Sequence, residues 1–398
     1  MTPKLGPAGR MARFFIDSKL TPLVIVASIL LGIFAVIQLP REEEPQIIVP
    51  MIDIFVAMPG ASAEEVTQRV SRPMAKLLWE IPGVEYVYST SQPGMAMAIV
   101  RFYVGQDEER SIVRLQSKLM ANFDRIPQNV SHPLIKPRYI DDVPILSLTF
   151  WSREADHYLL RRVAAEMEDR IKREPNVSLT GLIGGLRRTV RVELDPVRMA
   201  AFHLDAGQVA GMLLSANAET DAGAFPSAGG QILVHTGGFL KNADDVGRVV
   251  VKVADGRPVY LRDVAAITDG PDEPDQYVFH GAGAGASALA PEERAAQEDG
   301  IFPAVTLTVA KRKGTNAITV ADRVLERLAD ARGTVIPDNI QVTVTRNYGE
   351  TAQEKSNELL LHMLIAIISV TILIWFTLGH RESGVVAQIG RASCRERV

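Results

Sequence analysis

The sequence has little of what most catalytic and metal-binding proteins use. Cysteine occurs once in 398 residues, as Cys394, so no internal disulfide can form and a thiol-based site has no support. The seven histidines lie far apart, without the spacing of metal ligands. The Gly-rich stretch 281–285 lacks the lysine and the preceding strand of a phosphate-binding loop. These absences predict a protein that is not an enzyme and holds no metal or other cofactor.

An excess of positive charge is also absent. The chain has 43 Lys and Arg against 47 Asp and Glu, a formal net charge of −4, which gives no reason to expect a nucleic-acid partner.

Two long runs contain no Asp, Glu, Lys or Arg, at 20–39 and 359–378. As helices of about twenty residues they would be roughly 30 Å long, which matches the hydrocarbon core of a bilayer. Neither run has the polar stripe of a buried core helix, and no small-residue cleavage motif follows the first. The sequence therefore predicts two transmembrane helices that bracket one large extramembrane body.

Flanking charge predicts the orientation of these helices. The first 19 residues carry four Lys and Arg against one Asp, whereas three glutamates at 42–44 follow the first run. Because cytoplasmic flanks are enriched in positive charge, both ends of the chain are expected in the cytoplasm and the body outside.

The body reads as two copies of one α+β pattern. Residues 40–142 alternate as strand, helix, strand, strand, helix and a strand-like segment, which is a ferredoxin-like order. The same order begins again at 143–183 and resumes at 282–349, so 184–281 is interpreted as an insertion. Within the insertion, the Ala-, Gly- and Ser-rich stretch 217–230 predicts an exposed arm or loop. The paired carboxylates Asp141 and Asp142 are interpreted as a linker turn at the end of the first copy.

The last ten residues do not fit this pattern. Residues 389–398, IGRASCRERV, resemble the translation of a sequencing adapter, and the alternative is a short basic cytoplasmic tail. The stretch 379–388 is interpreted as a cytoplasmic loop that leads into a third membrane helix.

Several motifs together resemble the resistance–nodulation–division permeases of the acriflavine-resistance type, which export hydrophobic and amphiphilic compounds. The matching segments are Leu39-Pro40, Glu44-Pro45-Gln46, Pro59-Gly60-Ala61-Ser62-Ala63-Glu64-Glu65-Val66, Ile81-Pro82-Gly83-Val84-Glu85, 260–265 and 376–382. The resemblance implies a multi-pass protein of the bacterial inner membrane with a large periplasmic body. It also implies a homotrimer driven by proton antiport, which works with a periplasmic adaptor and an outer-membrane channel.

The resemblance names the parts of the body. It implies cytoplasmic residues 1–19, a first transmembrane helix at 20–39, a first porter subdomain at 40–142, a second at 143–183 and 282–349, a docking subdomain at 184–281, and a second transmembrane helix at 359–378. The proton relay of the family lies on later membrane helices, outside this sequence.

The resemblance also places a substrate path in the cleft beside the second porter subdomain. The family lines its pocket with aromatic residues, but the matching places here fall near Pro144 and Thr180. Ile145, Ser178 and Thr180 are therefore the candidate substrate-binding residues, and ordinary strand packing is the alternative for each. Trp151 and its neighbour Phe150 lie close enough in sequence to replace the missing aromatic surface.

Two other functions stay open from the sequence. One is a heavy-metal exporter of the same family, for which Met95 and Met97 on one strand face offer soft ligands. The other is a non-transporting envelope protein whose body docks partners.

We expect protease added to intact spheroplasts to cut the body between the two apolar runs. The reason is that the predicted orientation places this body outside the membrane, and immunoblotting would detect the fragments. A body that is cut only after lysis would contradict the predicted topology.

Overall fold

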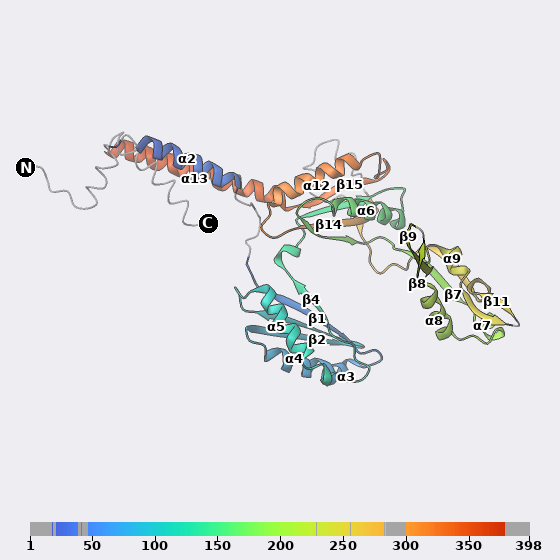
Figure 1. Cartoon of the computed structure of the whole chain (residues 1–398). Helices are drawn as coiled ribbons and strands as arrows, with labels where there is room; N and C mark the ends of the chain where they lie inside the picture. Colours follow the sequence, from blue (N-terminus) through green and yellow to red (C-terminus); the bar gives the residue numbers. More distant parts are fainter. Residues whose placement is uncertain are drawn as a thin grey trace, which may run out of the picture.

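The computed structural model describes residues 18, 21–38, 41, 47–227, 229–254, 256–281, 283 and 300–378. The predictions for 379–388 and 389–398 and almost all of those for 1–19 lie outside the described residues. The body is α+β, as the sequence predicts, and Figure 1 shows it as three lobes, which we call the first, second and inserted units.

The first unit is an antiparallel sheet covered on one face by helices. Its strands follow the order β2-β3-β1-β4, which is the ferredoxin-like arrangement. The strands are β1 (Met51–Ala57), β2 (Val84–Gln92), β3 (Met95–Phe102) and β4 (Leu134–Arg138), and the helices are α3 (Ala63–Val66), α4 (Arg72–Trp79) and α5 (Glu108–Met120). Alternate residues of β3 are fully buried, so its apolar side faces the core.

Capping residues start the helices of this unit. Ser62 and Glu65 form a capping box at α3, and the Asp107 carboxylate accepts the backbone N–H of Arg110 at 2.8 Å at α5. The sequence predicts one continuous helix through α3 and α4, but a π-helical stretch separates them at Thr67–Ser71. Pro73 follows it, and a proline lacks the N–H that an α-helical turn would use, which accounts for the wider turn.

The second unit repeats this topology with strands that are distant in sequence. Its strands are β5 (Leu146–Trp151), β6 (Val177–Ile183), β14 (Ile301–Lys311) and β15 (Gln341–Asn347), and its helices are α6 (His157–Ile171) and α12 (Ala317–Ala331). β14 pairs with β6 on one side and with β5 on the other, and β15 pairs with β5. The order β6-β14-β5-β15 therefore corresponds to that of the first unit, and short β13 (Phe279–Gly281) extends the β6 side.

The inserted unit leaves and rejoins the second unit through two paired strands. β7 (Arg188–Leu194) and β12 (Ala265–Pro271) are antiparallel neighbours. The rest of the unit comprises α7 (Pro196–Ala201), α8 (Ala206–Ala216), α9 (Ala243–Gly247), β10 (Val250–Ala254), β11 (Arg257–Tyr260) and α10 (Leu261–Val264). Its buried apolar residues form a core of their own, centred on Leu261 and Val264.

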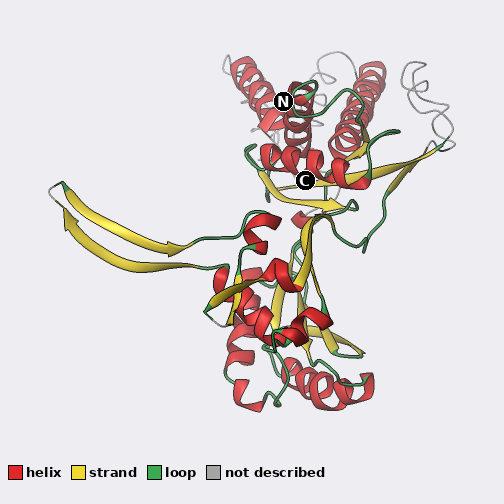
Figure 2. Ribbon diagram, turned by 90° about the vertical axis from the view of Figure 1, so that its right-hand side faces the viewer, coloured by secondary structure: helices red, strands yellow, loops and turns green. Residues whose placement is uncertain are grey.

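A long hairpin projects from the inserted unit. β8 (Glu219–Ser227) pairs with β9 (Gly230–Gly237), and Figure 2 shows the two strands extending far from the body. The sequence predicts an exposed arm or loop at 217–230. The arm is present, and most of this stretch forms strand β8 of the hairpin. Its small residues give no local strand signal, so the pairing with β9 supplies the structure.

Two helices extend from the body to the same side in Figure 1, α2 (Thr21–Gln38) and α13 (Tyr348–Leu378). Among the described residues, one helix is long and apolar enough to cross a membrane, Tyr348–Leu373, with a mean hydropathy of 1.8. It overlaps the run predicted at 359–378 and begins earlier, inside the body. A helix is present in the first run as well, and its transmembrane role stays a prediction.

We expect Gly185→Ala to destabilise the body more than Gly60→Ala. Both glycines have positive φ, +72° and +81°, so each alanine strains the backbone by about 1 kcal/mol. At Gly185 a Cβ would also lie 2.7 Å from Arg161 Cβ and 2.7 Å from Val305 Cγ2, whereas nothing lies within 4 Å at Gly60. Overpacking adds about 1–3 kcal/mol, which thermal unfolding of both variants would measure. Equal losses would contradict this close packing.

Candidate functional site

The sheet of the second unit has one face without helices. Leu146, Leu148 and Phe150 of β5 point into the core shared with α6 and α12. Because side chains alternate along a strand, Thr149 and Trp151 lie on the opposite face. This uncovered face is the candidate functional site, and Arg346 lies on it as well, because it pairs with Ser147.

Threonine hydroxyls cover the middle of this face. Thr149 Oγ1 lies 3.0 Å from Thr306 Oγ1 and 3.1 Å from Thr345 Oγ1, across three neighbouring strands. Thr149 is buried and its hydroxyl is satisfied by these bonds, so the row is rigid and uncharged. Such a surface offers hydrogen-bonding groups without repelling an apolar molecule.

An aromatic cluster lies at the end of the threonine row. The ring of Trp151 stacks on His280 and on Phe302, with centroid distances of 4.7 Å and 5.2 Å. Trp151 Nε1 donates a hydrogen bond to Thr343 Oγ1 at 2.9 Å, which fixes the indole in place. Trp151 is only 2% exposed, whereas His280 and Phe302 are partly exposed. The outer surfaces of these two rings are therefore what the cluster offers to a ligand.

His280 lies directly opposite Phe302 in the pairing of β13 with β14. Its Nε2 atom is buried and has no hydrogen-bond partner among the described residues. Burial lowers the pKa of His280 below its ordinary value of 6.5 and favours the neutral imidazole. The cluster therefore combines aromatic surface with one unused hydrogen-bonding atom. At its margin, the Arg153 guanidinium lies 5.6 Å from the centroid of the Phe302 ring.

The three predicted site residues lie at the other end of β14. Ile145 is buried, and its backbone N–H donates to Val309 O at 2.9 Å. Thr180 pairs with the same Val309, and its hydroxyl donates to Glu168 Oε1 of α6 at 2.7 Å, so it lies on the helix side. Ser178 Oγ donates to Lys311 O at 2.8 Å. The structure thus brings the three together at this end of the strand. Ile145 is buried, Thr180 lies on the helix side and Ser178 is exposed, and their role in binding stays a prediction.

Sequence reasoning identified one member of the aromatic cluster and missed two. Trp151 was expected to supply aromatic surface, and it does lie on the uncovered face, whereas Phe150 is fully buried in the core. His280 and Phe302 were not identified. The alternation of Phe302, Thr306 and Thr308 along β14 was a signal available for Phe302, since it places all three on the Thr149 face.

Other chemistry has little support in the part of the chain that the structure describes. No group of three or more His, Cys, Asp or Glu residues there is arranged to hold a metal ion.

The body thus has a sheet face with threonine hydroxyls and an aromatic cluster, and it continues into a long apolar helix. Sequence comparison identifies the class of protein. Residues 11–389 match the AcrB/AcrD/AcrF family, so the chain belongs to this family of resistance–nodulation–division permeases. Relatives include multidrug resistance protein MdtC of Yersinia enterocolitica, 25% identical over 371 residues, which are 93% of this chain and 34% of MdtC. MdtC proteins of Yersinia pseudotuberculosis and Yersinia pestis are 26% identical, with the same coverage. The chain spans about a third of the length of these relatives.

We expect the stability of the protein to fall as the pH drops below about 6.5, in part because of His280. Burial lowers the pKa of His280 in the folded state, whereas in the unfolded state it keeps its ordinary value of about 6.5. Between the two pKa values the unfolded state binds more protons than the folded state, so stability is lost as the pH falls through this range. His280→Phe should reduce the difference between unfolding midpoints at about pH 7.5 and about pH 5.5. Phe279→Leu, which alters the same strand without removing a titratable group, should keep it. An unchanged difference in His280→Phe would contradict the burial of this imidazole.

Proposed function

We propose that this chain is the N-terminal part of an inner-membrane efflux transporter that exports hydrophobic or amphiphilic compounds by proton antiport. The uncovered face of the second unit is the observation that carries the proposal. Its neutral threonine row and the Trp151–His280–Phe302 cluster suit molecules with aromatic and apolar surface. Membership of a family of efflux permeases supports export, and the relatives are named multidrug resistance proteins.

Each of the three units corresponds to one of the subdomains predicted from the sequence. In this proposal the first unit corresponds to the porter subdomain at 40–142, the second unit to the porter subdomain at 143–183 and 282–349, and the inserted unit to the docking subdomain at 184–281. The equal strand orders of the first two units support this division. Helix α2 and the apolar part of α13 cross the inner membrane, with the three units in the periplasm.

The β8–β9 hairpin supports assembly with further copies of the chain. It exposes Phe225, Leu233 and Ile232 to 52%, 60% and 46%. An isolated two-stranded ribbon with exposed apolar residues is marginally stable in water, so a partner surface would stabilise it. We assign this partner to a neighbouring copy in a homotrimer, which works with a periplasmic adaptor and an outer-membrane channel.

We expect Phe302→Ala to weaken efflux of an aromatic amphiphilic dye. Loss of one aromatic contact of about 1 kcal/mol lowers affinity roughly fivefold, so dye accumulation rises. The full-length polypeptide that contains this chain would be produced in bacteria that lack their own multidrug efflux pumps. Cell fluorescence would then be measured with and without a protonophore. Phe239→Ala is the matched control, because Phe239 is 65% exposed on the inserted unit, away from the cluster.

Three outcomes would decide among the functions. Dye export that a protonophore abolishes and Phe302→Ala weakens supports the proposal. Protection against metal salts without dye export would favour the heavy-metal exporter. Neither activity, with normal membrane insertion, would favour the docking protein.

A further inference from the structure

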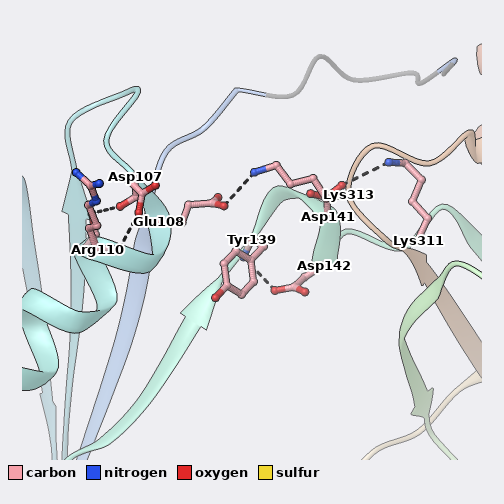
Figure 3. A network of polar contacts seen from close by, with 9 residues as sticks. Asp107, Glu108, Arg110, Tyr139, Asp141, Asp142, Lys311 and Lys313 are labelled. Carbon is pink, nitrogen blue, oxygen red and sulfur yellow. Dashed lines mark hydrogen bonds and ion pairs between the residues drawn. The ribbon is translucent and has the colours of Figure 1, made fainter. Parts of the chain in front are cut away.

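Two ion pairs lie at the junction of the first and second units: one joins the second unit to α5 of the first, and the other joins it to the turn that links the two units. Lys311 Nζ lies 3.4 Å from Asp141 Oδ1, and Lys313 Nζ lies 3.2 Å from Glu108 Oε2. Figure 3 shows the two lysines of the second unit pointing toward Glu108 of the first unit and toward Asp141 of the linking turn. Lys311 is the last residue of β14, Asp141 belongs to the short turn of helix η3 (Ile140–Asp142), and Glu108 begins α5. We call these four residues the joint.

The Lys311–Asp141 pair is buried. The side chains of Lys311 and Asp141 are 6% and 13% exposed, whereas Lys313 in the second pair is 53% exposed. Burying two charges costs so much solvation that such a pair stabilises a fold little more than apolar residues would. Removing one partner is costly, however, because the other charge is left buried. A buried pair at a boundary can therefore fix the arrangement of the parts it joins even where it adds little net stability.

Rigid elements hold both sides of the joint. On the second unit, Lys311 O accepts the Ser178 hydroxyl at 2.8 Å, and the N–H of Arg312 donates to Asn176 O at 2.8 Å. In the turn that links the two units, Asp142 Oδ2 accepts the backbone N–H of Tyr139 at 3.0 Å, which closes the turn that presents Asp141. The ion pairs therefore fix whole elements and not loose side chains.

The same strand connects the joint to the candidate site. β14 carries Phe302 of the aromatic cluster near one end and Lys311 at the other. Nine residues of extended chain separate them, which is about 30 Å. A change in the angle between the units would displace β14 at Lys311. The strand is paired with β6 at Lys311, with β5 over Ala304–Val309 and with β13 at Phe302, so pairing on one side or the other connects the two ends.

We propose that Lys311 and Asp141, supported by Lys313 and Glu108, are positioning residues that set the angle between the first and second units. The uncovered face of the second unit is thereby held in one orientation relative to the first unit. This role concerns the geometry of the chain and does not depend on its being an efflux transporter.

Distances between spin labels test the proposal on the whole 398-residue chain in lipid nanodiscs. Cys394, the single cysteine, is replaced by Ser, and labels are attached at Lys76→Cys in α4 and Asp169→Cys in α6, both exposed helix positions. We expect a narrow distance distribution in this background. Lys311→Met should broaden it and shift its mean by several ångströms, while Lys311→Asp combined with Asp141→Lys should make it narrow again.

The matched control removes an ion pair inside one unit. Lys118 Nζ lies 2.6 Å from Glu80 Oε2 in the first unit, and Lys118→Met should leave the distribution unchanged. An unchanged distribution in Lys311→Met, or no recovery in the charge-exchanged pair, overturns the proposal. Should circular dichroism show that Lys311→Met does not fold, Lys313→Met carries the same test at the more exposed pair, with the same expected and contrary results.

Discussion

The backbone pairing of β14 is the constraint on which the second unit depends. This strand bonds to β5, β6 and β13, so residues about 150 positions apart in sequence must meet, as Thr149 and Thr306 do. The inserted unit lies between β6 and β14 in the sequence. The chain enters this unit along β7 and leaves it along the neighbouring antiparallel strand β12. Because β7 and β12 lie side by side, the chain enters and leaves the inserted unit at the same point. The strand order of the second sheet is therefore kept, although a unit with its own core is inserted in the sequence.

The two repeated units differ in what their uncovered sheet faces carry. On the first sheet this face holds charged and aromatic side chains, including Arg101 over the Tyr86 ring and Lys136 over the Phe55 ring. On the second sheet it holds hydroxyls and the Trp151 cluster. The topology is thus common to both, while the surface chemistry is specific to each.

Local pattern predicted most of the elements and little of the site. The sequence predicts a strand at 145–151 and helices at 157–173 and 317–332, and the structure has them at 146–151, 157–171 and 317–331, because burial of one face dictates each period. The stacking of His280 on Trp151 was beyond such reasoning, since it depends on which strand β13 pairs with. The burial of Asp141 was missed for the same reason: its partner Lys311 is 170 residues away. Strand β8 was also missed, because its small residues have low strand propensity and it is a strand through its pairing with β9.

Helix α13 has a mechanical consequence. Its 31 residues make a rod of about 46 Å that starts against α12 in the body and ends in the apolar run. No proline or glycine follows Gly349 within it, so the rod has none of the usual points of bending. Any tilt of the second unit is therefore carried along this helix, and its far end moves by a distance proportional to its length.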